Sequence, residues 1–319
     1  MVGYHASHEQ HRPSALLALA ERAEAAGFDE VSSSDHFSPW SGRQGESGFA
    51  WSWLGAAMHA TRVPFGVVNA PGQRYHPAII AQAIATLLEL FPGRLWVALG
   101  TGEASNEHIT GDRWPSKAER NARLVECVEV IRRLLRGEEV SVDGHVRVDR
   151  AQLWTTPPAM PPLYGAALSE ATARWCGSWA DGLLTVHRPP EELRALIGAF
   201  REGGGEGKPV AVQVKVAIGG TDAEALAAAH EQWRTNVFDS ALMADLVTVE
   251  QFEIAATHVP PEAVAKAVLA SAEPGRHVDF LHDLLACGVD DLYVHHVPRE
   301  QEAFLDIYGT KVLPELRSA

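Results

Sequence analysis

The chain has 319 residues, enough for two average domains or one large barrel, and a hydrophobic share of 46% that is ordinary for a globular protein. Its formal net charge of -14 disfavours a nucleic-acid-binding surface, which needs clustered basic residues. No apolar run is long enough to cross a bilayer, and the amino terminus lacks a signal-peptide pattern. We therefore expect a cytoplasmic protein that binds neither nucleic acid nor membrane.

Short apolar runs alternate with amphipathic helical patterns along the whole chain. The run 95–99 is apolar without interruption, as expected for a strand buried on both faces. The pattern that starts at Leu16 has helical spacing, and Gly27 is placed to end that helix. We predict strands at 1–6, 28–31, 63–69, 95–99, 162–167, 181–186, 210–218 and 291–295. We predict helices at 16–26, 49–61, 77–88, 117–135, 170–179 and 278–286, a further helix that passes through Phe200, and a final helix that passes through Phe304 and Leu305.

Three further segments depart from this alternation. The polar, glycine-containing loop 42–48 is long enough to cover a site. Residues 139–148 are typical of a hairpin that turns at Asp143-Gly144. Residues 222–272 are predicted to be helical throughout, interrupted only at Pro260-Pro261, which is more than one connection requires. We interpret 222–272 as a helical insertion between the seventh and eighth strands.

Eight strands that are each followed by a helix indicate an α/β protein with a (β/α)8 TIM barrel. We expect a single domain over residues 1–319 that contains the 222–272 insertion. A doubly wound sheet is the main rival, but Gly100-Thr101-Gly102-Glu103 does not match its GxGxxG fingerprint. The three cysteines, Cys127, Cys176 and Cys287, lie far apart without CxxC spacing, so we expect them to be buried and reduced.

Polar side chains gather at the predicted strand ends, where barrel enzymes build their sites. The second strand ends in three serines followed by Asp35, His36 and Trp40, and the fourth is followed by Glu103. The alternative is that Asp35 caps the next helix and that Trp40 fills a gap in the core.

Ser169 and Thr172 open a helix after a strand, where backbone N–H groups and hydroxyls suit a phosphate, although Ser169 also fits an ordinary helix cap. No His-x-His pair is present, and His295-His296 are adjacent and point to opposite faces of a strand, so we expect no metal. A GxSxG nucleophile motif is also absent.

Four motifs in register resemble the bacterial luciferase-like flavin and deazaflavin oxidoreductases. Within that family the nearest branch is that of the glucose-6-phosphate dehydrogenases that use coenzyme F420. The resemblance runs from Tyr4 to about residue 310. The motifs are Asp35-His36-Phe37-x-Pro39-Trp40, Arg74-Tyr75-x-Pro77 with Ile80-Ala81-Gln82, Gly100-Thr101-Gly102-Glu103-Ala104-x-Asn106-Glu107 and Trp179-Ala180-Asp181-Gly182.

The resemblance implies that a flavin or deazaflavin ring lies in the mouth of the barrel and exchanges hydride with a small-molecule substrate, with oxygen as an optional co-substrate. His36 and Trp40 would line the substrate side of the ring, Glu103 would donate a proton near its edge, and Glu9 would face the substrate. These four are the expected catalytic residues. The expected cofactor-binding residues are Asp35, Val68, Asn69, Thr101, Gly102, Asn106, Ala167, Ser169 and Thr172.

Family members also carry a non-proline cis peptide that would fall at Val68–Asn69, and they commonly form dimers, so we expect both features here. The loop Leu168-Ser169-Glu170 is closer to the phosphate loop of FMN-using relatives, and His187-Arg188-Pro189-Pro190 replaces a lysine-bearing loop, while Thr185 fits. We therefore favour FMN as cofactor, with F420 as the alternative. A flavin-binding protein without catalysis remains a second functional hypothesis.

Overall fold

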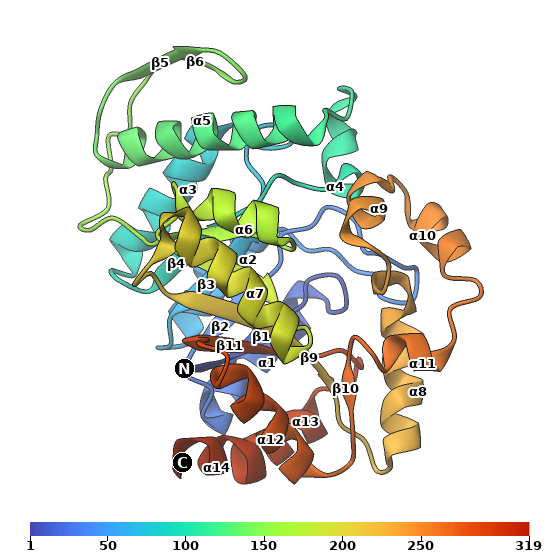
Figure 1. Ribbon diagram of the computed structural model, residues 1–319. Helices are drawn as coiled ribbons and strands as arrows, with labels where there is room; N and C mark the ends of the chain where they lie inside the picture. The colour runs from blue at the N-terminus through green and yellow to red at the C-terminus, as the bar shows by residue number, and fades with distance from the viewer. Residues whose placement is uncertain (319) are drawn as a thin grey trace.

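Eight parallel strands form a closed ring in the computed structural model, which describes residues 1–318 (Figure 1). The strands of the ring are β1 (Val2–Ala6), β2 (Val31–Ser33), β3 (Phe65–Asn69), β4 (Leu95–Leu99), β7 (Leu163–Ala166), β8 (Gly182–Val186), β9 (Val210–Ala217) and β11 (Asp291–His296). They pair in this order, and β11 pairs with β1 to close the ring. The (β/α)8 barrel predicted from the sequence is confirmed.

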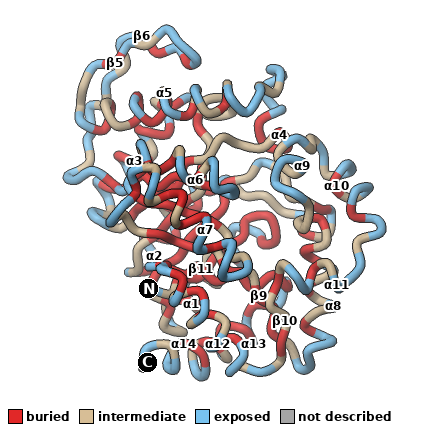
Figure 2. Tube along the Cα trace, in the orientation of Figure 1, coloured by how far each residue is buried: buried red, intermediate tan, exposed pale blue. Residues whose placement is uncertain are grey.

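Helices surround the ring and cover the outer faces of its strands, so the buried chain lies at the centre and the exposed chain outside (Figure 2). Local signals in the sequence set their ends. The first helix begins with Pro13 at its first position and ends at Gly27, whose φ of 96° favours glycine. The helices are α1 (Pro13–Ala26), α2 (Ala50–Ala60), α3 (Pro77–Leu90), α5 (Lys117–Leu135), α6 (Glu170–Gly177), α7 (Pro190–Phe200), α12 (Pro274–Leu285), α13 (Glu302–Ile307) and α14 (Leu313–Ser318).

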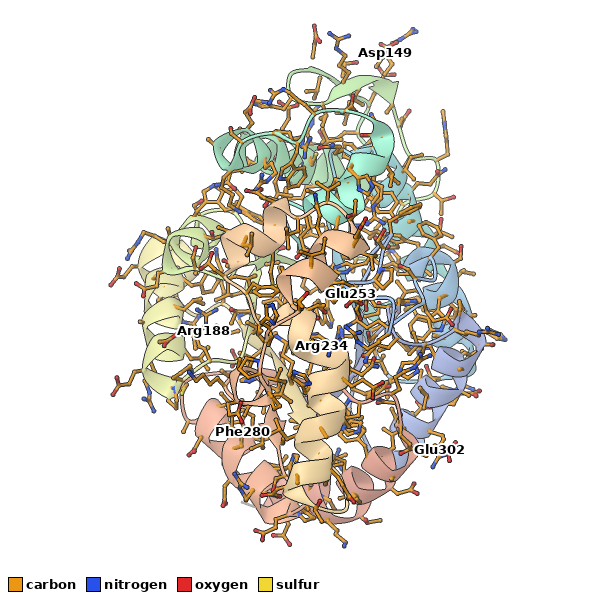
Figure 3. All side chains as sticks on the ribbon, turned by 90° about the vertical axis from the view of Figure 1, so that its right-hand side faces the viewer. Asp149, Arg188, Arg234, Glu253, Phe280 and Glu302 are labelled. Atoms are coloured by element: carbon orange, nitrogen blue, oxygen red, sulfur yellow. The ribbon has the colours of Figure 1, made fainter. Side chains whose placement is uncertain are left out.

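The segment between β9 and α12 is not helical throughout, so that part of the prediction is wrong. It consists of α8 (Asp222–Trp233), α9 (Ser240–Asp245), α10 (Val249–Ala255), α11 (Pro261–Val264) and the short strand β10 (Leu269–Ala270). Capping side chains divide it, because Thr221, Asp239 and Thr248 each accept a hydrogen bond from the first turn of a new helix. Figure 3 looks onto this segment, with Arg234 labelled just after α8 and Glu253 in α10.

The predicted hairpin is confirmed and consists of β5 (Val140–Asp143) and β6 (Arg147–Ala151). It lies outside the barrel, beyond α5, at the top of Figure 1. Cys127, Cys176 and Cys287 are buried and unbonded, as expected. None of the helices within residues 1–318 is both long and apolar enough to span a membrane.

Aromatic side chains fill the amino-terminal end of the barrel. Trp96 packs against Tyr164 and Tyr293, with ring centroids 5.3 and 5.1 Å apart. A Cβ at Gly66 would lie 1.9 Å from the Trp96 ring, so only glycine fits beside this indole. The buried Glu30 carboxyl accepts hydrogen bonds from Trp96 and Tyr293. This plug closes one end of the ring and leaves the other end for a site.

The expected cis peptide at Val68–Asn69 is wrong, because all described peptide bonds are trans. In the trans chain β3 stays paired with β4 through Asn69, and the Asn69 carbonyl then accepts a hydrogen bond from Gly100 N at 2.9 Å. The strand therefore continues its ladder to the last residue.

Candidate active site

A cavity of about 1080 Å³ opens at the carboxyl ends of the barrel strands. It is bounded by the turns after the strands and by α9, which lies over its mouth. Every site residue expected from the sequence lines this cavity. They are Glu9, Asp35, His36, Trp40, Val68, Asn69, Thr101, Gly102, Glu103, Asn106, Ala167, Ser169 and Thr172.

Asp35 is held in place by a buried polar network at the end of β2. Its carboxylate accepts hydrogen bonds from Asn69 Nδ2 at 2.7 Å and from the Tyr75 hydroxyl at 3.1 Å. Arg74 donates to the Asp35 carbonyl at 2.7 Å and lies 3.6 Å from carboxylate oxygens of both Asp35 and Glu107. Asp35 does not cap a helix. The network fixes a buried charge at the wall of the cavity.

Glu9, which is buried, and His36, which is half-buried, form an acid–imidazole pair. Glu9 Oε1 lies 3.2 Å from His36 Nδ1, at an angle outside ordinary hydrogen-bond geometry. The other carboxylate oxygen accepts hydrogen bonds from Ser7 and Ser34 at 2.7 and 2.9 Å. Burial alone would raise the pKa of Glu9, but His36 and the two hydroxyls together hold it below its ordinary value. A carboxylate beside Nδ1 favours the imidazole proton there and leaves Nε2 as the base.

Glu103 sits in the same cavity with the opposite electrostatic bias. Burial raises its pKa, the nearby Glu9 carboxylate raises it further, and His36 acts in the other direction. The Trp40 indole, which lies beside the Glu103 carboxyl, also lowers its pKa. The Trp40 ring meets the His36 ring edge-on, 4.4 Å between centroids. The site thus combines an ionised acid, a base and an acid biased towards protonation.

Asn106 connects two of the turns that bound the cavity. It lies in α4 (Ala104–Glu107), directly after β4. Its side-chain oxygen accepts hydrogen bonds from the backbone nitrogens of Phe37 and Ser38 at 2.8 and 3.3 Å. The turn that carries His36 is therefore tied to the turn that carries Glu103.

The predicted phosphate loop is an ordinary helix start that also faces the cavity. The Ser169 hydroxyl accepts a hydrogen bond from Thr172 N at 3.3 Å and lies 3.0 Å from the Thr172 hydroxyl. The helix-cap interpretation is correct, and both side chains still line the cavity. Arg188 lies near this loop, because its guanidinium donates to the Leu168 carbonyl at 3.3 Å. Thr101 accepts a hydrogen bond from Lys117 at 3.0 Å.

The sequence interpretation missed the wall formed by the last strands of the ring. Lys215 of β9, His295 of β11 and His5 of β1 all line the cavity. The alternation Val-Gln-Val-Lys-Val in β9 is a signal that one face of that strand is polar, and it could have identified Lys215. Thr185, at the end of β8, is also buried here with an unpartnered hydroxyl.

The cover over the cavity differs from the one predicted, because loop 42–48 contributes no residue to the lining and α9 contributes several. Asp245 at the end of α9 accepts a hydrogen bond from the Trp114 indole at 2.9 Å and lies 3.9 Å from Arg120. The Arg120 guanidinium lies over the Trp114 ring, 4.3 Å from its centroid. α9 is thereby fastened to the segment between β4 and α5.

The cavity fits a planar, polar ring system. Its walls carry buried polar atoms without partners among the described residues, including Glu103 Oε2, Asn69 Oδ1 and Thr185 Oγ1. Such atoms are costly unless a ligand satisfies them. Aromatic surface from Trp40 and Trp233 provides the apolar part of the lining.

Comparison with known proteins supports an oxidoreductase. A family model described as luciferase-like monooxygenase matches residues 2–291. An F420-dependent glucose-6-phosphate dehydrogenase of Nakamurella multipartita is 36% identical over 99% of this chain and 96% of its own length. An F420-dependent hydroxymycolic acid dehydrogenase of Mycobacterium tuberculosis is 35% identical over 99% and 88%, respectively. A solved F420-dependent secondary alcohol dehydrogenase, in complex with an F420–acetone adduct, is 30% identical, covers 99% of each chain and has a TM-score of 0.93.

These relatives correct the predicted preference for FMN over F420. Their names support the F420 alternative and give no support to FMN as the main cofactor. They also favour an enzyme over a non-catalytic flavin-binding protein. The chain belongs to the luciferase-like monooxygenase family and is an oxidoreductase.

Proposed function

We propose that this protein is an F420-dependent dehydrogenase that oxidises the hydroxyl group of a small organic alcohol. The observation that carries the proposal is the Glu9–His36 pair beside Glu103 in one cavity. Three relatives support it, since their names describe F420-dependent dehydrogenases of a sugar phosphate, of a hydroxymycolic acid and of secondary alcohols.

Coenzyme F420, when bound, would supply a two-electron acceptor for hydride. Asn69, Thr101 and Ser169 would hold it along the wall formed by β3, β4 and β7. His36 would take the hydroxyl proton of the alcohol through Nε2, because Glu9 favours a proton on Nδ1. Glu103 would hold or donate a proton in the same cavity, where burial favours its protonated form. Trp40 would exclude water and orient the alcohol next to His36.

Cofactor titration followed by turnover tests this proposal. The purified protein is titrated with F420 and separately with FMN, and bound F420 is then followed by its absorbance on addition of secondary alcohols and of glucose 6-phosphate. We expect tighter binding of F420, and reduction by at least one alcohol. Tighter binding of FMN would contradict the cofactor assignment. Binding of F420 without reduction by any of these alcohols would contradict the proposed substrate class, and normal turnover in both His36→Ala and Glu103→Gln would contradict the proposed roles.

We also propose three properties of the protein as a whole. We propose that residues 1–319 form one domain that includes the 222–272 insertion, that the protein is a homodimer, and that it is cytoplasmic. Light scattering coupled to size-exclusion chromatography tests the dimer, and a single cooperative unfolding transition tests the single domain.

A further inference from the structure

Two unpartnered polar groups lie side by side on the wall missed by the sequence interpretation. Lys215 and His295 are direct partners in the register between β9 and β11. Residues opposite each other on neighbouring parallel strands point to the same face, with the strands about 4.8 Å apart. Both side chains line the cavity. The Lys215 ammonium makes no hydrogen bond or ion pair with any residue in the range 1–318.

The protonation of the His295 ring is fixed by its neighbour Gln10. Gln10 Nε2 donates to the Val297 carbonyl at 2.6 Å, and a carbonyl can only accept. The Gln10 oxygen therefore faces His295 Nε2, at 2.8 Å, and this nitrogen must carry the proton. Burial, followed by nearby His5 and Lys215, holds the pKa of His295 well below its ordinary value, so the ring is neutral.

The remaining nitrogen of His295 is consequently a bare acceptor. His295 is only 3% exposed, and its Nδ1 has no hydrogen-bond partner in the described part of the chain. Next to it, Lys215 offers a donor, and burial together with Arg188 lowers the pKa of Lys215 to about 7. An amine donates a hydrogen bond whether or not it is protonated. The wall thus presents one acceptor and one donor at neighbouring positions.

A neutral hydroxyl group satisfies this pair, and an anion does not. A hydroxyl donates to Nδ1 and accepts from Nζ at the same time. A carboxylate or phosphate oxygen accepts a hydrogen bond from Nζ. It has no proton to donate to Nδ1, so its negative charge is repelled by the Nδ1 lone pair. We propose that Lys215 and His295 form a subsite that binds a second hydroxyl group of the substrate, so that the substrate is a diol or polyol rather than a simple alcohol.

A row of rings connects this subsite to the proposed base. His36 contacts Trp40 at 4.4 Å, Trp40 contacts Trp233 at 6.0 Å, and Trp233 contacts His295 at 4.9 Å between ring centroids. The substrate would lie along this row, with its reacting hydroxyl at His36 and its second hydroxyl at Lys215. In this respect the inference rests on the proposed alcohol oxidation.

Matched four-carbon ligands test the subsite by binding. Dissociation constants of butan-2-ol, butane-1,3-diol, butane-2,3-diol and 3-hydroxybutyrate are measured by tryptophan fluorescence, with and without F420. Because of its second hydroxyl, a diol is more strongly hydrated in water than butan-2-ol. A purely apolar pocket would therefore bind the diols more weakly than butan-2-ol. We expect at least one diol to bind about tenfold more tightly than butan-2-ol, and 3-hydroxybutyrate to bind no more tightly than butan-2-ol.

Two variants assign that preference to the pair. Lys215→Met and His295→Phe preserve side-chain volume and should each remove the preference of about tenfold for the diol over butan-2-ol. The exposed Lys311→Met is the matched control and should change neither constant. Should His295→Phe fail to fold, Lys215→Met decides alone.

The outcomes separate the subsite from the proposed function. Equal binding of diols and butan-2-ol by the wild type, an unchanged preference in Lys215→Met, or tightest binding of 3-hydroxybutyrate would each overturn the subsite. A diol preference that disappears in Lys215→Met supports the subsite even where no alcohol reduces F420, and that second result contradicts only the proposed function.

Discussion

Buried histidines should make this protein unusually sensitive to acid. Burial lowers the pKa of His5 and of His296 from 6.5 to about 3, and the two side chains are 5% and 2% exposed. Both are neutral in the folded protein, whereas the unfolded chain takes up a proton as the pH falls through 6.5. Their contribution to stability is therefore fully present above pH 6.5 and is lost as the pH falls towards 3.

The size of the effect follows from these values. At about pH 5 each histidine costs about 2 kcal/mol of unfolding free energy relative to about pH 7.5, or about 4 kcal/mol for both. That is a large part of the unfolding free energy of a typical folded protein, which is about 5–15 kcal/mol. Buried carboxyls with a raised pKa, such as Glu30 and Glu103, change stability in the opposite direction, so a single-residue comparison is needed.

His296→Phe provides this comparison, because the ring stacks on Phe304 at 4.6 Å and Nδ1 has no partner within residues 1–318. We expect the variant to lose about 2 kcal/mol less stability than the wild type between about pH 7.5 and pH 5. Urea unfolding followed by circular dichroism measures this difference, and the exposed His145→Gln serves as control. Identical pH dependence in His296→Phe and the wild type would refute the reasoning.

Other substitutions test the remaining parts of the site. Glu9→Gln removes the charge that sets the His36 proton, so kcat/KM for F420 reduction should fall about 10- to 100-fold with the midpoint of unfolding nearly unchanged; activity within threefold of wild type would contradict the role. Asp35→Asn should weaken F420 binding measured by fluorescence titration at least about tenfold, because the donors that surround Asp35 then face an amide. Asp245→Ala removes the acceptor of Trp114 and should raise the rate of F420 release in stopped-flow measurements several-fold, whereas an unchanged rate would show that α9 does not retain the cofactor.

The carboxyl ends of the strands that precede residues 222–272 could be predicted, because the residues there combine strong local signals. A buried apolar run followed at once by Gly100 to Glu103, or by Asp35 to Trp40, marks both a strand and the turn that it supports. The parallel ring then brings all such turns to one end. Thus a one-dimensional pattern was enough to locate most of the cavity.

The other wall and the cover could not be predicted, for two different physical reasons. Lys215 looks like any solvated lysine in an alternating strand, and only the closure of the ring shows that its face is internal. The 222–272 segment has helical composition throughout, and tertiary packing decides where its caps divide it. The preference for FMN rested partly on Ser169, whose hydroxyl serves as a helix cap, a role that says nothing about the cofactor.

The amide of Asn106 has a mechanical consequence for the chemistry. Through its bonds to the backbone at 37 and 38, it makes the acid-bearing and base-bearing turns one body rather than two independent ones. Glu103 and His36, the proposed proton donor and acceptor, would then keep their separation while the rest of the cavity mouth moves. The two groups would stay aligned when the cover moves. A chain without the Asn106 amide would have to re-form that alignment at every turnover.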